Sequence, residues 1–298
     1  MPERLNAVTL DAPAKVNLRL RILAREESGY HSLETLFCAL SLADEVGVAR
    51  GGPGIRLRVE GGVDTGPPEK NLALRAAERF YRELGEEAAV DLHLVKRIPS
   101  AAGLGGGSSD AAAVLRALNA LHGGIFPRTA LLQMAAELGS DVPFFACGSP
   151  LALAWGRGER LLPLPPLPPR PVLVAHPGQA MPTADAFRRV AELRGGTYRP
   201  RATLLDPQAL VSWDAVAALA GNDFEPVVVE RIPVLADALA GLRAEGARIA
   251  LLAGSGSSVF GVFEGEAERE RAAARLEALG MRCWRARTLD AEPAPVPG

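Results

Sequence analysis

The sequence predicts an α+β fold in two parts, in which half-buried strands are combined with amphipathic helices. Residues 8–23 alternate between apolar and polar side chains, which is typical of a strand with one buried face. Residues 247–288 indicate two strands, a helix and a further strand, without the long parallel series of a doubly wound sheet. Between these parts, residues 162–172 (LPLPPLPPRPV) are too rich in proline for a helix or a central strand.

We interpret this proline-rich segment as a stiff extended connector. It separates a predicted N-terminal domain, residues 1–162, from a predicted C-terminal domain, residues 163–298. The alternative is a proline-rich surface loop inside a single domain. Further helices are expected at 71–84, from about Ser109, at 226–246 and at 264–280, with strands at 90–95 and 281–288. The tail AEPAPVPG (291–298) is expected to lack regular structure.

Composition excludes several classes of function. The formal net charge is −2, so the chain has no overall basic field that would attract nucleic acid or an anionic membrane. The cysteines, Cys38, Cys147 and Cys283, are far apart and form no CxxC pair, so neither a zinc site nor a disulfide framework is expected. The N-terminal stretch lacks the apolar run of a signal peptide. We therefore expect a soluble, cytoplasmic protein. The sequence leaves both a monomer and a homodimer open.

The most informative segment is residues 98–115, IPSAAGLGGGSSDAAAVL, where a glycine-rich turn links a predicted strand to a predicted helix. The turn contains Gly103, Gly105, Gly106 and Gly107. Without Cβ atoms, a backbone can approach a ligand closely. Ser108 and Ser109 are good N-cap residues, and the free N–H groups of a helix start bind phosphate well. A plain flexible loop is the alternative, because neither GK[ST] nor GxGxxG is present.

The complete string PxxxGLGGGSSD before an alanine-rich helix resembles the second motif of the GHMP kinases. Residues 12–18 (APAKVNL) resemble the first motif of that family, and residues 253–261 (AGSGSSVFG) resemble the third, which supports the phosphate loop. SGYHSLET, GSDVPFF, AHPG and GNDFEP resemble one branch, whose alcohol substrate carries a CDP group. The resemblance covers almost the full chain. It implies the two-domain GHMP kinase fold, with the active site in the cleft between the domains.

The chain departs from that branch at the start of the glycine loop. Ser100, Ala101 and Ala102 stand where the branch more often has Met or Ile and glycines. Alanine has less backbone freedom than glycine, so a positive φ at these positions would be strained.

The resemblance implies an ATP-dependent kinase that uses Mg²⁺ and phosphorylates an alcohol. Lys15 and Asp141 match the catalytic positions of the family. Asp141 would accept the proton of the substrate hydroxyl, and Lys15 would keep Asp141 ionised and stabilise the developing charge. Outside such motifs, Lys15 would be an ordinary surface lysine and Asp141 a turn residue. No metal ligand is assigned. The expected ATP-binding residues are Pro99, Ser100, Ala101, Ala102, Gly103, Leu104, Gly105, Gly106, Gly107, Ser108 and Ser109.

The same resemblance assigns residues to the acceptor substrate. Tyr30 and Phe187 would stack on opposite faces of a cytosine ring, and His31 would hydrogen-bond its edge. Asn17 would face the alcohol, and Thr183 would contact the diphosphate. The polar residues of GNDFEP, which are Asn222, Asp223 and Glu225, are expected to cap a helix rather than bind ligand.

Two rival hypotheses remain. One is another GHMP small-molecule kinase, of the homoserine or mevalonate type, and GYHSLET argues against it. The other is a catalytically silent nucleotide-binding regulator, and the presence of both Lys15 and Asp141 argues against that.

Overall fold

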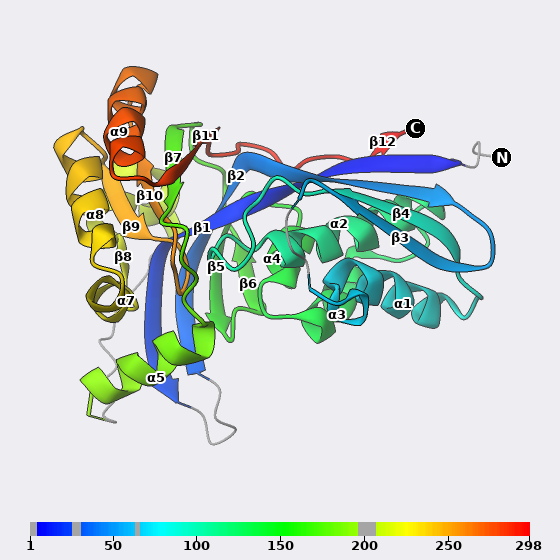
Figure 1. Cartoon of the computed structure of the whole chain (residues 1–298). Helices are drawn as coiled ribbons and strands as arrows, with labels where there is room; N and C mark the ends of the chain where they lie inside the picture. The colour runs from blue at the N-terminus through cyan, green and yellow to red at the C-terminus, as the bar shows by residue number, and fades with distance from the viewer. Residues whose placement is uncertain (1–4, 26–30, 63–65, 196–206) are drawn as a thin grey trace.

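The computed structural model describes residues 5–25, 31–62, 66–195 and 207–298. Two β-sheets and their covering helices form the molecule, so the predicted α+β class is confirmed (Figure 1). Tyr30 lies outside the described residues. Among the described residues, no helix is both long enough and apolar enough to cross a membrane.

The larger sheet has the order β12-β1-β2-β4-β3, with β5 also paired to β2, β6 paired to β5 and β8 paired to β1. Its pairs are antiparallel apart from β3 with β4 and β8 with β1. One face is covered by helices α1 to α4 (Figure 1). The strands are β1 (Ala7–Arg25), β2 (His31–Arg50), β3 (Gly54–Glu60), β4 (Ala89–Val95), β5 (Leu151–Gly156), β6 (Arg160–Pro163), β8 (Gly221–Asn222) and β12 (Val296–Pro297). The helices are α1 (Leu72–Leu84), α2 (Gly106–Leu121), α3 (Arg128–Leu138) and α4 (Val142–Ala146).

The smaller sheet is antiparallel, in the order β11-β7-β10-β9. Helices α8 and α9 pack against it. Its strands are β7 (Pro171–His176), β9 (Ile249–Leu252), β10 (Val259–Val262) and β11 (Arg282–Arg287). The helices of this part are α5 (Thr183–Leu193), α6 (Trp213–Leu219), α7 (Glu225–Arg231), α8 (Val234–Ala244) and α9 (Glu266–Ala278). Short 3₁₀ turns occupy Pro68–Lys70 and Pro207–Val211.

Three expectations about elements are corrected. Helix α2 begins at Gly106, three residues before the predicted start. The helix expected at 226–246 is divided into α7 and α8, because Pro233 has no N–H and keeps Ile232 out of the helical region (φ −129°, ψ 79°). The tail expected to be irregular forms β12, which pairs with β1 through Val296 and Pro297.

The proline-rich connector lies between β6 and β7 and has no helix or strand over residues 164–170. Leu164 and Leu167 nevertheless point into the core, with 6% and 4% exposure. The domain boundary at 162/163 remains a prediction.

Strand β1 belongs to every part of the core. Residues 8, 10 and 12 pack in the cluster under α1 and α2, residues 14, 16 and 18 in the cluster shared by both sheets, and residues 20 and 22 in the cluster under α5, α7 and α8. Because side chains alternate along a strand, the polar residues between them share the other face of β1. This arrangement brings Lys15 and Asn17 to the middle of the molecule.

Candidate active site

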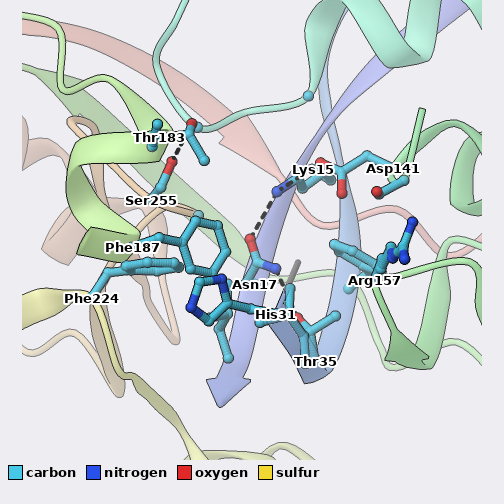
Figure 2. Close-up of a pocket in the computed structure, with 18 of the residues that line it drawn as sticks. Lys15, Asn17, His31, Thr35, Asp141, Arg157, Thr183, Phe187, Phe224 and Ser255 are labelled. Carbon is cyan, nitrogen blue, oxygen red and sulfur yellow. Dashed lines mark hydrogen bonds and ion pairs between the residues drawn. The ribbon is translucent and has the colours of Figure 1, made fainter. Parts of the chain in front are cut away.

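A lysine and an aspartate that are distant in the sequence meet in a large cavity (Figure 2). Lys15 lies on β1 and Asp141 directly precedes α4, and Lys15 Nζ is 3.3 Å from Asp141 Oδ2. The Lys15 side chain is 5% exposed, whereas that of Asp141 is 32% exposed. A ligand in the cavity can therefore reach the carboxylate, while the buried ammonium stabilises its negative charge.

Asn17 and Thr35 fix the position of the lysine. Lys15 Nζ donates a hydrogen bond to Asn17 Oδ1 (2.9 Å), and Asn17 Nδ2 donates to Thr35 Oγ1 (2.7 Å). Thr35 Oγ1 in turn donates to the Arg19 carbonyl oxygen (2.7 Å), so the chain of bonds ends on the backbone of β1. The period of two along β1 places Lys15 and Asn17 on one face, as the sequence predicted.

The cavity measures about 890 Å³, which is in the range of small-molecule sites. Elements from both sheets contribute to its wall. The residues that line it are Lys15, Asn17, Leu20, His31, Leu33, Thr35, Phe37, Gly103, Gly105, Ser140, Asp141, Arg157, Thr183, Ala184, Phe187, Arg188, Ala191, Glu192, Phe224, Gly254 and Ser255.

One end of the cavity is aromatic. The His31 and Phe187 rings stack at 4.4 Å between centroids with 16° between planes, and Phe187 meets the edge of Phe224 at 4.8 Å. Close to this end, Thr183 Oγ1 and Ser255 Oγ are 2.9 Å apart (Figure 2). The structure thus brings His31, Phe187 and Thr183 to the same cavity as Lys15, Asn17 and Asp141.

Sequence reasoning did not single out Arg157. The hairpin between β5 and β6 carries this residue at its tip, between Gly156 (φ 72°) and Gly158 (φ 117°). A Cβ on Gly158 would lie 3.2 Å from the Ser140 carbonyl oxygen, so the tip packs against the residue before Asp141. The Gly-Arg-Gly string was the available signal, because glycines on both sides of a charged residue are typical of a tight turn. Thr35, Phe224 and Ser255 were also missed, although each lies inside a motif that the sequence pointed out.

The glycine loop lies on the other side of Lys15. The Lys15 N–H donates to the Leu104 carbonyl oxygen (2.9 Å), which joins β1 to the loop. Gly105 has φ 75°, and a Cβ there would be 3.0 Å from Phe145 Cζ and 3.1 Å from Lys15 Cγ. Glycine is required at this position, because a side chain would displace the lysine.

The expected N-caps of the helix are not caps. Gly105 is the N-cap of α2, so Ser108 and Ser109 lie in its first turn and no side chain caps the start. The first N–H groups of α2 have no partner inside the helix, and these are the groups that bind anions. Ala101 has φ 52°, so the strain expected for a non-glycine residue is present at that position.

A second glycine loop, residues 253–258, interlocks with the first. Gly103 has φ 78°, and a Cβ there would lie 2.0 Å from the Ala253 carbonyl oxygen. A Cβ on Gly254 would lie 2.9 Å from the Gly103 carbonyl oxygen. In the same loop, Ser257 Oγ is 3.2 Å from His176 Nε2. The two loops therefore form one unit, in which neither backbone can accept a side chain at the contact.

The polar residues of GNDFEP connect elements instead of capping α7, whose N-cap is Phe224. Asn222 Nδ2 donates to the Leu252 and Gly254 carbonyl oxygens, each at 2.8 Å, and thereby holds the second glycine loop. Asp223 accepts from the Ile22 N–H (2.9 Å) and from two arginines. Its pKa is held below the ordinary value because the Ile22, Arg194 and Arg21 hydrogen bonds outweigh the effect of burial. Glu225 accepts from the Leu252 N–H at 3.3 Å.

A second pocket, of about 380 Å³, lies on the outer side of the first glycine loop. Residues of the loop, from Ile98 to Ser108, form most of its wall, and Lys70, Asn71, Leu72, Lys96 and Asp110 complete it. Gly103 and Gly105 line both pockets, so the two cavities meet at these glycines, and Gly105 packs against the Lys15 side chain.

Two interlocked glycine loops, the free start of α2 and a Lys–Asp pair in the large cavity are features to compare with known proteins. The family model described as "GHMP kinases N terminal domain" matches residues 71–149, and the one described as "GHMP kinases C terminal" matches residues 208–280. The chain belongs to the GHMP kinase family. It is therefore an ATP-using kinase with a small-molecule substrate.

Within this class, the similar proteins point to one enzyme. The chain is 45% identical over 305 residues to a 4-diphosphocytidyl-2-C-methyl-D-erythritol kinase of Anaeromyxobacter dehalogenans (strain 2CP-C), covering 98% of this chain and 94% of that protein. A crystal structure of 4-(cytidine 5'-diphospho)-2C-methyl-D-erythritol kinase superposes with a TM-score of 0.78 at 40% identity, covering 94% and 98% of the two chains. A homoserine kinase from Cytophaga hutchinsonii, with 20% identity, a TM-score of 0.71 and coverage of 99% and 98%, shares the fold alone.

Proposed function

We propose that this chain transfers the γ-phosphoryl group of ATP to the 2-hydroxyl of 4-diphosphocytidyl-2-C-methyl-D-erythritol, a step of the non-mevalonate isoprenoid precursor pathway. The observation that carries the proposal is the Lys15–Asp141 pair in the large cavity, next to Gly105, which lines both pockets. An acceptor hydroxyl in the large cavity and a nucleotide on the glycine loop would both reach this point. The 45% identical relative supports the choice of acceptor.

The catalytic work is positioning and electrostatic stabilisation, as phosphoryl transfer requires. Asp141, with its carboxylate partly open to the cavity, takes the proton of the acceptor hydroxyl as general base. Lys15, held by Asn17, stabilises the negative charge that develops at the hydroxyl oxygen and on the transferred group. The first N–H groups of α2, at Gly106 and Gly107, bind the nucleotide phosphates.

The aromatic end of the cavity is the proposed cytidine site. His31 stacks on the Phe187 ring in this structure, so it would turn aside for the cytosine to stack there, and its ring nitrogens would then reach the base edge. Tyr30 remains the proposed second face. The Thr183 and Ser255 hydroxyls, which are 2.9 Å apart, would donate to the diphosphate.

Among the described residues, no three His, Cys, Asp or Glu side chains gather as a metal-binding group. The proposed Mg²⁺ would arrive with the nucleotide, because this ion prefers phosphate oxygens and keeps several waters. When bound, Mg²⁺ would neutralise part of the phosphate charge during transfer.

The test is an ADP-release assay against a panel of alcohols with and without a CDP group, in which only the CDP-bearing acceptor should be turned over efficiently. CMP should inhibit competitively against that acceptor, whereas AMP should compete with ATP. Efficient turnover of homoserine or mevalonate, together with no effect of CMP, would reject the cytidine assignment. A chain that binds ATP but releases no ADP with any acceptor would instead be a regulator.

A further inference from the structure

A buried cluster of three charged side chains lies beneath the first glycine loop. Lys96, in the segment after β4, donates hydrogen bonds to Asp44 Oδ2 on β2 and to Asp110 Oδ2 on α2, the latter at 2.5 Å. All three residues are buried, with exposures of 6%, 0% and 3% in that order. Lys96 and Asp110 line the pocket on the outer side of the loop. The cluster belongs to neither the acceptor cavity nor the Lys15–Asp141 pair.

The cluster joins the start of the loop to the helix that follows it. Asp44 Oδ1 accepts the N–H groups of Arg97 (2.5 Å) and Ile98 (2.8 Å), which are the first residues of the loop segment. A Cβ on Gly106, at the first turn of α2, would lie 3.4 Å from Asp44 Oδ2. Any change of charge in the cluster therefore changes the electrostatic potential at the anion-binding N-terminus of α2.

The charges of the cluster do not balance. Two carboxylates share a single ammonium, and among the described residues Asp110 Oδ1 is buried without a hydrogen-bond partner. Burial raises the pKa of Asp110 to about 7, with the Asp44 carboxylate adding to the shift and Lys96 opposing it. Burial lowers the pKa of Lys96, but the two carboxylates outweigh that and raise it overall, so the lysine stays charged.

Within the part of the chain that the structure describes, the charged groups that shift the pKa of Asp110 are Lys96 and Asp44. The residues that α1 and β1 contribute to the core against α2 are apolar, and they include Ala73, Ala76 and Ala77 on α1 and Leu10 and Ala12 on β1. Lys70, in the 3₁₀ turn before α1, lines the same outer pocket.

We propose that Asp110 is a positioning residue that takes up a proton from solvent when a nucleoside triphosphate binds the glycine loop, so that the cluster beneath the phosphates becomes neutral. The inference rests on the nucleotide assignment of the proposed function. A polyanion at the start of α2 disfavours a second negative charge below it, and the proton on Oδ1 removes that charge. Protonation also removes the negative charge from a buried carboxylate oxygen that no donor satisfies.

The sign of the pH dependence follows from linkage. Bound phosphates raise the pKa of Asp110 above its value in the free protein, so affinity for nucleotide is highest below pH 7. Affinity then falls as the pH rises through 7, because the free protein loses the proton that the complex keeps. It levels off above the pKa of the complex. A shift of one pH unit in that pKa corresponds to about a tenfold change in the dissociation constant.

The experiment is isothermal titration of the full chain with the Mg²⁺ complex of a non-hydrolysable ATP analogue, in buffers of different ionisation enthalpy. Repeated between pH 6 and pH 8.5, it gives the number of protons taken up per nucleotide. The wild type should take up a fraction of a proton near pH 7, on the order of 0.5, with a matching loss of affinity above that pH. Asp110→Asn should abolish both effects, because an amide cannot titrate.

The control is Asp91→Asn, the same change at an exposed carboxylate on β4 that pairs with Arg56, and it should behave as the wild type. Binding without proton uptake in the wild type at every pH overturns the inference but leaves the nucleotide assignment intact. That result does not depend on whether the Asp110 variant folds. Uptake that persists in Asp110→Asn also overturns it. A wild type that fails to bind the analogue at all overturns the nucleotide assignment together with this inference.

Discussion

The two pockets that meet at Gly103 and Gly105 differ in the residues that line them. Side chains from β1, β2, α5 and several turns line the large cavity, whereas residues of one glycine-rich loop form most of the outer pocket. A wall of side chains selects its ligand by shape and hydrogen bonding, so single substitutions should change specificity or catalysis. A pocket formed by glycines leaves room for its ligand because these residues have no Cβ atoms. Substitutions that add a Cβ atom there should therefore weaken ligand binding. The variants below test this contrast.

The largest effect is expected at Asp141. Asp141→Asn keeps the shape of the side chain but cannot accept a proton, so kcat should fall by ~10²–10⁴-fold. The Michaelis constant for ATP should change little, because Asp141 does not line the outer pocket. Steady-state kinetics with both substrates measure this. Turnover close to that of the wild type would remove Asp141 from the role of base.

Two glycines of the same loop provide a matched pair. A Cβ on Gly103 would be 2.0 Å from the Ala253 carbonyl oxygen, at φ 78°, whereas the nearest atom to a Cβ on Gly107 is 3.9 Å away, in Leu72. Strain and overpacking together cost about 2–5 kcal/mol. Gly103→Ala should therefore weaken ATP binding by about 30-fold or more, taking 1.4 kcal/mol per decade.

Gly107→Ala should bind ATP within a few-fold of the wild type in the same titration, because φ at this position is not positive and the space is open. Equal affinities of the two variants would show that the contact between the glycine loops does not shape the nucleotide site.

A smaller effect is expected at the aromatic end of the acceptor cavity. Loss of base stacking in Phe187→Ala should cost about 1–3 kcal/mol, which raises the Michaelis constant for the CDP-bearing acceptor by roughly 5- to 150-fold. Phe187→Tyr keeps the ring face and should be mild. The Michaelis constant for ATP should stay the same in both variants. If the Michaelis constant for the acceptor is unchanged in Phe187→Ala, this ring does not contribute to substrate binding.

The elements and motifs that depend on local patterns could be predicted from the sequence. The alternation around Lys15 predicted β1, and Asn71 caps the predicted helix α1 through a bond from the Ala73 N–H. The glycines at 103 and 105 predicted a tight backbone, and both have positive φ. Lys15 and Asp141 were paired on the resemblance to a family, because no local pattern relates residues so far apart.

What could not be predicted depends on contacts between distant segments. Helix α2 starts at Gly106 and not at the predicted Ser109. Its N-cap is Gly105, which packs against Lys15 and Phe145, and this contact favours a glycine. The tail carries no apolar pattern, yet Glu292 forms an ion pair with Arg116 (3.0 Å). Arg116 also donates a hydrogen bond to the Pro293 carbonyl oxygen at 2.6 Å. These two contacts hold the tail next to β1. Such pairings are absent from any short window of sequence.

Strand β1 has a consequence for how the molecule unfolds. Its nineteen residues supply side chains to all three core clusters, and the Lys15 side chain projects from its middle. Neither half of the molecule can lose its core without releasing a strand on which the other half depends. The two halves should therefore unfold in one cooperative transition, although the family models match them separately. Lys15 is then protected by the stability of the whole molecule against local opening.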